Sequence, residues 1–596
     1  MFGTNYCKNI DKLEIVSTKN NANVQFNLSD LEDAKVNSLI LTKYVTKIID
    51  SNSNKYVDKN KRFDELKYGG SFMDWCSLTH SVDSAPAQIT DNLYYSNNGE
   101  YVLIKGVVSI GTKGSANTFI MGDGKFKGYN KITGVKFVQS GTVGVSAFED
   151  TEINSITLDE NVSDAVIRLS SRAFKNTKIV SIDLSFMNFV KDDEGVSKGE
   201  QFANNTLLES ISNINLWNIS KENSTYVFSG CSKLGSAQII DEIPNAPIGF
   251  TNWFSYFYLD ASTSYQIPEG TFKDCGMLTQ VELPTNIEKV GKSAFENCSS
   301  LTSVSFKFNK SNAYMEVARN STYGKYLLIG ENAFANCSNL QTLTFNGVWG
   351  YANASNSSKH SYFGNYYIEG KGATGAQNSA SASYGLIGFK SKAFLNCGKL
   401  KRVNYIGSLT DDILTSETNQ YNSNLANLWI ENMFEVNGTF ASNMNDILSA
   451  NPLYYGAKLY VGESLDNATA ITEISGRQVK ATAWAGSGIE KAVINDASEL
   501  TSKLLFVNCK NLNIVEFSTW KSIGVVYDNN VAYRGCSNLT TITLCDELKN
   551  GIYDNNNIHW TADNGLLTRV SSDGKTKELY LAFGNSFDDS LITGIH

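Results

Sequence analysis

A thirteen-residue motif recurs along this chain and constrains its fold more than any other feature. Three clear copies follow the pattern Phe-x-x-Cys-x-x-Leu-x-x-(Val/Leu)-x-apolar, and they lie at 271–283, 294–306 and 333–345. A unit of this length cannot bury its apolar face alone, so its repetition implies stacking into a solenoid whose neighbours share a core. The usual estimate of domain number from chain length therefore does not apply.

The phenylalanine of the motif recurs at regular intervals in the first half of the chain. The intervals of 22, 26, 28 and 26 residues fall within the range of about 20–29 residues that leucine-rich repeats occupy. These copies have their phenylalanine at Phe126, Phe148, Phe174, Phe202 and Phe228. Later copies, most of them separated by inserted residues, are at Phe272, Phe295, Phe334, Phe394, Phe506 and Tyr533.

The end of the motif predicts a short strand. Its last two apolar residues are at period two, which is typical of a strand with one buried face. The Asn-Cys or Gly-Cys pair before it predicts a turn, and the Ala-Phe pair further back predicts a second packed layer. Six prolines among 596 residues leave most backbone donors available for a strand ladder. We therefore predict an α/β-type repeat solenoid that is mostly β, with short parallel strands on one face and turns or short helices on the other.

Two segments predict β-hairpins inserted in the array. Residues 92–104 alternate around an Asn-Gly pair, and residues 564–581 repeat the theme around an Asp-Gly pair. Such pairs, flanked by alternating residues, are strong short-range signals for a hairpin turn. Residues 50–90 are polar and irregular, and we expect a long insertion there.

Most of the ten cysteines occupy one slot of the motif. The slot residues are Cys7, Cys231, Cys275, Cys298, Cys337, Cys397, Cys509 and Cys536. Other copies have Tyr129, Thr151, Thr177, Asn205 or Ser487 in this slot, and these residues do not support a disulfide framework or a metal cluster. We therefore interpret the slot cysteines as small buried packing groups and favour free thiols, which leaves the redox compartment open.

The motif resembles that of a known repeat family. Residues 294–306 read Ala-Phe-Glu-Asn-Cys-Ser-Ser-Leu-Thr-Ser-Val-Ser-Phe, which is similar to the consensus of the BspA-type leucine-rich repeat. The resemblance is best over about 126–306, 331–406 and 484–545. It implies a leucine-rich-repeat array of a bacterial surface-protein class, also abundant in some protozoa, whose members are associated with protein binding and with adhesion to host proteins or other cells.

The pattern divides the chain into four segments. Residues 1–125 are expected to hold degenerate leading repeats with an insertion and a hairpin, and 126–306 to hold regular repeats. Residues 307–483 are expected to hold repeats interrupted by long insertions rich in Gly, Ser, Asn and aromatic residues. Residues 484–596 are expected to hold trailing repeats with a second hairpin, in an array that continues beyond the chain.

Composition and motifs exclude several functions. A net charge of −9 and a pI near 5.3 argue against nucleic acid as a partner, because such binding needs clustered Lys and Arg. No apolar run is long enough to span a membrane, and we find no signal peptide or anchor in the chain as given. The histidines have no partner at metal-ligand spacing, and no nucleophile elbow or phosphate-binding loop occurs. We therefore predict no catalytic, cofactor-binding or metal-binding residue.

One insertion carries our prediction for a binding site. Residues 346–390 combine Gly, Ser and Asn with aromatic residues, a composition typical of binding loops. The candidate partner-binding residues are Trp349, Tyr351, Tyr362, Phe363, Tyr366 and Tyr367. These rings either contact a protein or glycan ligand, or anchor the insertion onto the solenoid.

Three functions remain for such a chain. We favour a non-enzymatic protein-binding or adhesion protein that displays insertion loops toward a host or cell-surface protein or glycan, at a cell surface or outside the cell. The alternative is a structural or assembly module of a virion, fibre or intracellular scaffold, without a role in adhesion. An enzyme with its site in an insertion is disfavoured, because no titratable cluster supports it. The sequence leaves the ligand, the oligomeric state and the origin of the protein open.

Overall fold

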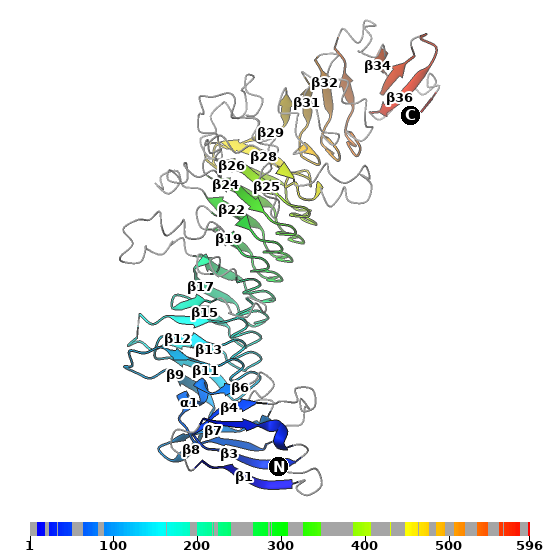
Figure 1. Cartoon of the computed structure of the whole chain (residues 1–596). Helices are drawn as coiled ribbons and strands as arrows, with labels where there is room; N and C mark the ends of the chain where they lie inside the picture. Colours follow the sequence, from blue (N-terminus) through cyan, green and yellow to red (C-terminus); the bar gives the residue numbers. More distant parts are fainter. Residues whose placement is uncertain are drawn as a thin grey trace, which may run out of the picture. The chain divides into compact units, whose positions relative to one another are not determined.

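The chain forms two compact units, Met1–Thr279 and Gln280–His596, and both are built from short stacked strands (Figure 1). The computed structural model describes residues 9–17, 23–31, 34–49, 63–80, 89–162, 164–190, 199–216, 219, 224–239, 266–283, 287, 289–307, 326–346, 386–406, 429–430, 448–462, 464–475, 484–494, 506–518, 533–545, 559–563, 565–571, 573–583 and 594–595.

In the first unit the strands form two rows. The first row contains the strands that follow the cysteine slot, in three sheets: β1 (Asn9–Ile15), β3 (Lys35–Leu41), β5 (Glu65–Tyr68), β7 (Leu93–Asn97) and β8 (Glu100–Leu103); then β9 (Gly106–Ile110), β11 (Ile132–Phe137) and β13 (Ser155–Leu158); then β15 (Ser181–Asp183), β17 (Ser210–Ile214) and β18 (Ser236–Ile239). All pairs within these sheets are parallel except β7 with β8.

The second row of this unit contains shorter strands, which precede the phenylalanine slot. It comprises β2 (Val24–Asn27), β4 (Val45–Ile49) and β6 (Thr79–His80), then β10 (Phe119–Ile120), β12 (Gly141–Val143), β14 (Ile167–Leu169) and β16 (Met187–Phe189). The unit also contains β19 (Gln266–Ile267), the 3-10 helix η1 (Leu28–Leu31) and α1 (Phe72–Ser77). Within the described ranges α1 is the one α-helix.

The second unit repeats this plan. Its first row contains β20 (Gln280–Glu282), β22 (Ser303–Lys307), β24 (Thr342–Asn346), β26 (Arg402–Ile406), β28 (Lys458–Gly462) and β29 (Thr469–Ile471), then β30 (Glu473–Ser475), β31 (Lys491–Ile494), β32 (Ile514–Phe517) and β33 (Thr541–Thr543). The second row has β21 (Lys289–Val290), β23 (Tyr326–Ile329), β25 (Leu386–Phe389) and β27 (Trp429–Ile430). The last sheet is β34 (His559–Asp563), β35 (Leu566–Val570), β36 (Lys577–Ala582) and β37 (Gly594–Ile595).

The predicted repeat solenoid of mostly parallel strands is confirmed, and so are both hairpins. The chain turns at Asn98-Gly99 between β7 and β8, and the second hairpin joins β35 to β36. The structure adds the second row of strands, where we predicted turns or short helices. These strands were missed because two to five residues are too few to show a period in sequence.

The prediction of a long insertion over residues 50–90 is wrong for its described part. Residues 63–80 form a repeat, because β5 pairs in parallel with β3 and β7 and β6 pairs with β4. Phe72 stacks on Phe126 at 6.0 Å between ring centroids. The motif was not recognisable here because α1, rather than the usual turn, presents this ring.

The core of each unit contains a stack of the motif phenylalanines. In the first unit successive rings from Phe126 to Phe272 are nearly parallel, with centroids 5.1–5.9 Å apart. In the second unit Phe295, Phe334 and Phe394 stack at 5.1 and 5.5 Å. All these rings are fully buried. Because each ring contacts the repeat before and after it, no single repeat is stable without its neighbours.

In several repeats the residue in the cysteine slot links the repeat to the one before it. The Cys337 thiol donates to the Phe295 carbonyl oxygen at 3.2 Å, and the Cys397 thiol donates to the Phe334 carbonyl oxygen at 3.1 Å. In another repeat the Asn205 side-chain amide makes the same type of contact with the Phe174 carbonyl oxygen at 3.1 Å. The cysteines of the described repeats are free thiols. In these repeats the slot therefore holds a buried hydrogen-bond donor.

The turn around each phenylalanine has a fixed backbone conformation. Residues two positions before and two positions after the ring have positive φ, as in Ser146 and Asp150 around Phe148. Asparagine and glycine tolerate this left-handed region best, and asparagine often occupies the second position. There the side chains form a ladder, because Asn336 donates to Asn297 Oδ1 at 2.8 Å and accepts from Asn396 Nδ2 at 2.7 Å.

Substitutions of Asn336 should separate its backbone role from its side-chain role. Asn336→Gly loses both amide hydrogen bonds but keeps φ at 63°, so we expect the free energy of unfolding to fall by about 1 kcal/mol. Asn336→Ala should cost about 1 kcal/mol more, because an alanine side chain is strained in the left-handed region. Urea denaturation followed by circular dichroism measures both.

The control is Asn339, whose side chain also bridges repeats, with the Ser299 carbonyl oxygen at 2.7 Å, but which lacks a positive φ. At this position alanine should be tolerated at least as well as glycine. The same order of stabilities at positions 336 and 339 would contradict the role of the left-handed conformation.

Candidate functional site

The sheet of β1, β3, β5 and β7 has one buried side and one side with polar residues. Leu39, Leu66 and Leu93 lie on the buried side and are inaccessible to solvent. Register places the residues of the other side in two lines across the strands. We name this side the β1–β7 face and define it by Lys12, Glu14, Ser38, Glu65, Lys67 and Tyr94.

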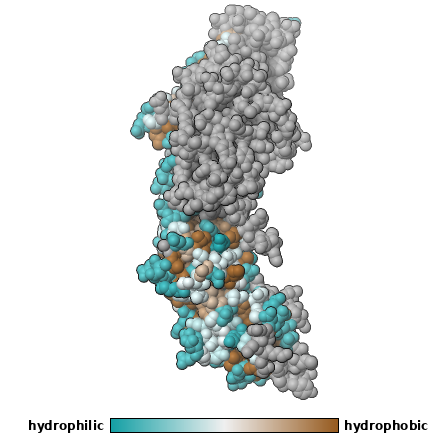
Figure 2. All heavy atoms as spheres, turned by 60° about the vertical axis from the view of Figure 1, so that its left-hand side comes forward, coloured by the Kyte–Doolittle hydropathy of each residue, from teal (hydrophilic) through white to brown (hydrophobic). Residues whose placement is uncertain are grey.

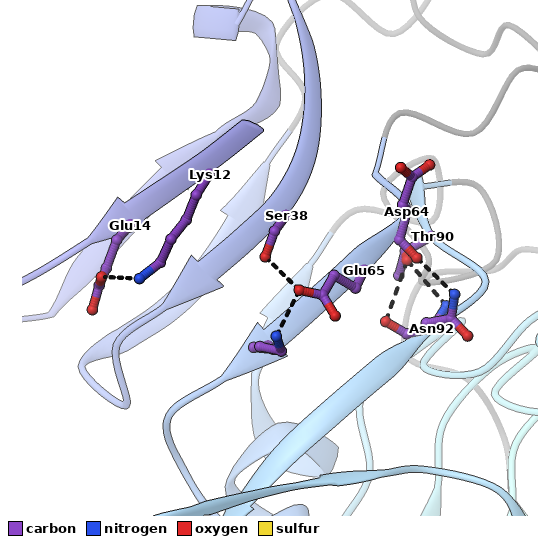
Figure 3. Close-up of polar contacts among 8 residues, drawn as sticks. Lys12, Glu14, Ser38, Asp64, Glu65, Thr90 and Asn92 are labelled. Atoms are coloured by element: carbon purple, nitrogen blue, oxygen red, sulfur yellow. Dashed lines mark hydrogen bonds and ion pairs between the residues drawn. The ribbon is translucent and has the colours of Figure 1, made fainter. Parts of the chain in front are cut away.

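The centre of the β1–β7 face is a connected set of polar side chains. Ser38 Oγ donates to Glu65 Oε1 at 2.7 Å, and Lys67 Nζ contacts the same oxygen at 2.6 Å (Figure 3). The Lys67 ammonium also lies 5.6 Å from the centroid of the Tyr94 ring. The hydrogen bond from Lys67, assisted by that from Ser38, holds the pKa of the Glu65 carboxyl below its usual value. The carboxylate is thus charged and fixed in place at neutral pH.

Further polar contacts flank this centre, on β1 at one side and in the residues just before β7 at the other. On β1 the Lys12 ammonium pairs with Glu14 at 3.1 Å. Before β7, Asn92 donates from Nδ2 to the Asp64 carbonyl oxygen at 2.7 Å, and its backbone N–H donates to Thr90 Oγ1 at 3.1 Å (Figure 3). These bonds fix where β7 begins and therefore where Tyr94 lies.

The chemistry of the face is that of recognition. It offers two carboxylates, two ammonium groups, the Ser38 hydroxyl and an aromatic ring, and Lys12, Glu14, Glu65 and Lys67 have side chains 25–56% exposed. Glu65 Oε2 has no hydrogen-bond partner among the described residues and is available to a donor from a ligand. In the part of the chain that the structure describes, no group of three or more potential metal ligands occurs.

In the second unit the described strands define where the long insertions of this region begin and end. Residues 308–325, 347–385 and 407–428 follow β22, β24 and β26, respectively, which are neighbours in one parallel sheet. The same segments lead into β23, β25 and β27, which are neighbours in the other row. The three segments therefore leave the array from adjacent strand ends.

The predicted partner-binding residues lie outside the described residues. These are Trp349, Tyr351, Tyr362, Phe363, Tyr366 and Tyr367, and their role stays a prediction. Sequence reasoning missed the β1–β7 face, because its members come from strands 26 or 27 residues apart in register. The available signal was the alternation in Glu65-Leu66-Lys67-Tyr68, which sets polar residues opposite buried ones.

A chemically unusual group is buried near α1. Lys125 is inaccessible to solvent and occupies the slot before the motif phenylalanine, where many copies have alanine. Its ammonium donates to the Leu78 carbonyl oxygen and lies 5.5 Å from the Trp75 ring centroid. Burial lowers the pKa of Lys125 to about 7, although Cys76 and Asp123 oppose this shift. Because no solvent reaches the amine, we assign it a structural role.

Parallel strands in two rows, a repeated buried phenylalanine and a polar outward face define a leucine-rich-repeat scaffold. The profile of the family described as "BspA type Leucine rich repeat region" matches the chain in six copies, over residues 119–248, 199–324, 324–357 and 463–559. The matches span more than half of the sequence, and the chain belongs to this family. A search of curated proteins gave no match.

Solved structures of leucine-rich repeat proteins align with the chain at low similarity. A leucine rich cell surface protein from Faecalibacterium prausnitzii is 16% identical, covers 57% of this chain and 89% of its own, and has a TM-score of 0.25. A leucine-rich repeat protein from Bacteroides ovatus is 15% identical over 76% of this chain and 92% of its own, with a TM-score of 0.28. The pneumococcal vaccine antigen PcpA is 12% identical over 76% and 87%, with a TM-score of 0.26.

The buried Lys125 should make stability depend on pH. Its pKa is depressed in the folded state relative to about 10.4 in the unfolded chain, so the unfolded state binds more protons between these values and stability rises with pH. The thiol of Cys76 has a raised pKa of about 12 and acts in the opposite direction above about pH 8.5. We therefore expect the first unit to gain about 1 kcal/mol of stability between pH 7 and 8.5.

Lys125→Met should remove this gain and raise stability at pH 7, because the buried amine is replaced by an apolar chain of similar length. Urea midpoints at several pH values between 7 and 8.5 measure the difference. A pH dependence equal to that of the unsubstituted protein would contradict the assignment.

Proposed function

We propose that this chain is a non-catalytic adhesion protein, displayed at a cell surface, that binds a protein ligand on the β1–β7 face. The observation that carries the proposal is the linked set Ser38, Glu65, Lys67 and Tyr94 on that face. These side chains are oriented by each other before any ligand arrives. Such pre-organisation lowers the conformational entropy lost on binding.

The family supports the general class of function that we propose, protein binding by a repeat scaffold. BspA-type repeats form scaffolds, and the resemblance noted in the sequence implies protein binding and adhesion at a surface. The mixture of charges and one ring on the β1–β7 face suits a protein surface with a basic group, which would donate a hydrogen bond to the open oxygen of Glu65. Protein interfaces commonly combine an aromatic anchor with paired charges in this way.

The inserted segments of the second unit supply a second part of the proposal. We infer that the aromatic residues of 346–390 contribute to ligand binding, as their composition predicts. The adjacent exits of three insertions from β22, β24 and β26 support this inference. Loops that leave a rigid array from neighbouring strand ends can act together on one ligand.

A bead assay tests the proposal. Beads coated with the full chain are applied to immobilised fibronectin, fibrinogen and collagen and to epithelial cells. The double substitution Lys67→Glu and Tyr94→Ala should weaken attachment at least about tenfold, because it reverses the charge at position 67 and removes the ring that Lys67 contacts. The matched control is Lys307→Glu, which alters an ion-paired lysine outside the β1–β7 face; Lys307 pairs with Glu282 of the neighbouring strand at 3.4 Å.

Attachment that survives the double substitution would contradict the β1–β7 face as the binding site. A chain in which residues 347–384 are replaced by a short Gly-Ser linker tests the insertion separately. Unchanged attachment of that chain would contradict the role of the aromatic residues. Failure of the unsubstituted protein to attach to every immobilised protein and to cells would contradict adhesion.

A further inference from the structure

The outer edge of the first hairpin is an unpaired strand edge. β8 is the last strand of its sheet and pairs only with β7. The Ile104 backbone N–H donates to the Leu93 carbonyl oxygen at 2.8 Å, so alternate residues of β8 point their backbone groups toward β7. By the alternation of antiparallel ladders, Tyr101 and Leu103 point their N–H and C=O groups outward. None of the described residues pairs with these groups.

The second hairpin differs in this respect. Its outer strand β36 has β37 on its far side, with Glu578 opposite Gly594 and Leu579 opposite Ile595 in parallel register. The outer edge of that hairpin is thus completed by a strand of the same chain. Among the described residues, no strand completes the edge of β8 in this way.

Exposed apolar side chains occur on β8 and on β9, which follows it in the sequence. Tyr101 is 40% exposed, Val102 is 37% exposed and Val107 is 64% exposed. They are three of the eight large apolar residues that are exposed among the described residues. Apolar patches are set among hydrophilic residues on the described surface of the first unit (Figure 2). An exposed strand edge presents unpaired backbone groups with which another strand can pair.

We propose that β8 pairs with β8 of a second copy of this chain, in antiparallel register about Val102. Tyr101 and Leu103, whose backbone N–H and C=O groups point outward, lie one on each side of Val102. Two copies of the strand can therefore pair symmetrically. Tyr101 of each copy then faces Leu103 of the other, with two backbone hydrogen bonds at each such pair. The Val102 residues meet at the two-fold axis.

The side chains that this register brings together across the two copies are compatible. An aromatic ring opposite a leucine is a favourable cross-strand pair. Lys105, which is exposed, lies diagonally across from Tyr101 of the other copy, where its ammonium can approach the ring face. The contact is small, so the dimer is weak in solution. Many copies on one surface would bind another surface more strongly than a single contact does.

The proposed register predicts which introduced cysteine forms a disulfide between two copies of the chain. Val102→Cys places two thiols opposite each other in a non-hydrogen-bonded pair, where the Cα atoms are about 4.5 Å apart, so mild oxidation should give a disulfide-linked dimer. Tyr101→Cys faces leucine and should give little dimer. Efficient cross-linking through position 101, or none through position 102, would overturn the register.

Sedimentation measures the association of the unsubstituted chain, over roughly 5 to 200 µM, where a weak small interface becomes visible. Tyr101→Pro removes one outward N–H without touching the bonds to β7, and the dissociation constant should rise at least about tenfold. Tyr101→Lys places its ammonium group near that of Lys105 of the other copy and should also weaken the dimer. Adding Lys105→Glu should restore it, which a misfolded hairpin would not allow.

A monomer throughout this concentration range would overturn the proposal, and so would a dimer that is indifferent to both substitutions of Tyr101. Neither result bears on adhesion to a ligand, which the bead assay measures with substitutions on other strands. A dimer that persists in the Lys67→Glu and Tyr94→Ala variant would show that the two surfaces are separate.

Discussion

The stack of phenylalanine rings is the interaction on which the remainder of each unit depends. Each ring is held by a turn with two left-handed residues, and the turn itself joins the next repeat. In the turn around Phe148, the N–H groups of Ser146, Phe148 and Asp150 donate to carbonyl oxygens of the following repeat at 2.8–3.0 Å. In most of the described repeats a strand precedes the turn and another follows it, so fixing the turn fixes the register of both rows.

This arrangement separates what must stay constant from what can vary. Residues of the turn are buried and face the neighbouring repeats, so their volume and donors are constrained. The number of residues between a first-row strand and the next second-row strand varies widely, and in the sequence the long inserted segments of the second unit lie there. Outward-facing side chains of the first-row strands are likewise not constrained by packing in the core. In Ser38, Glu65 and Lys67 that freedom supports a polar network without loss of packing.

The sequence predicted those features that depend on neighbouring residues. Phe-x-x-Cys and the period-two ending define the turn and the following strand, and the Asn-Gly pair defines the first hairpin. It did not predict contacts that depend on register, such as Ser38 with Glu65 at a separation of 27 residues. The repeat at 63–80 was missed because Phe72 reaches the ring stack from a helix. Lys125 was missed because a cation in an alanine slot breaks the pattern.

The hairpin of β7 and β8 is held in place by the residue in the cysteine slot of the repeat that follows it. There Tyr129 replaces cysteine, and its hydroxyl accepts from the Leu93 N–H at 3.2 Å and donates to the Ile104 carbonyl oxygen at 2.9 Å. This bridge closes the base of β7 and β8, while Phe72 packs against Tyr95 at 5.7 Å. Burial raises the pKa of Tyr129 to about 12, so the bridging proton remains in place at neutral pH. The edge of β8 is therefore held as a formed strand before any partner reaches it, which lowers the entropy lost on pairing.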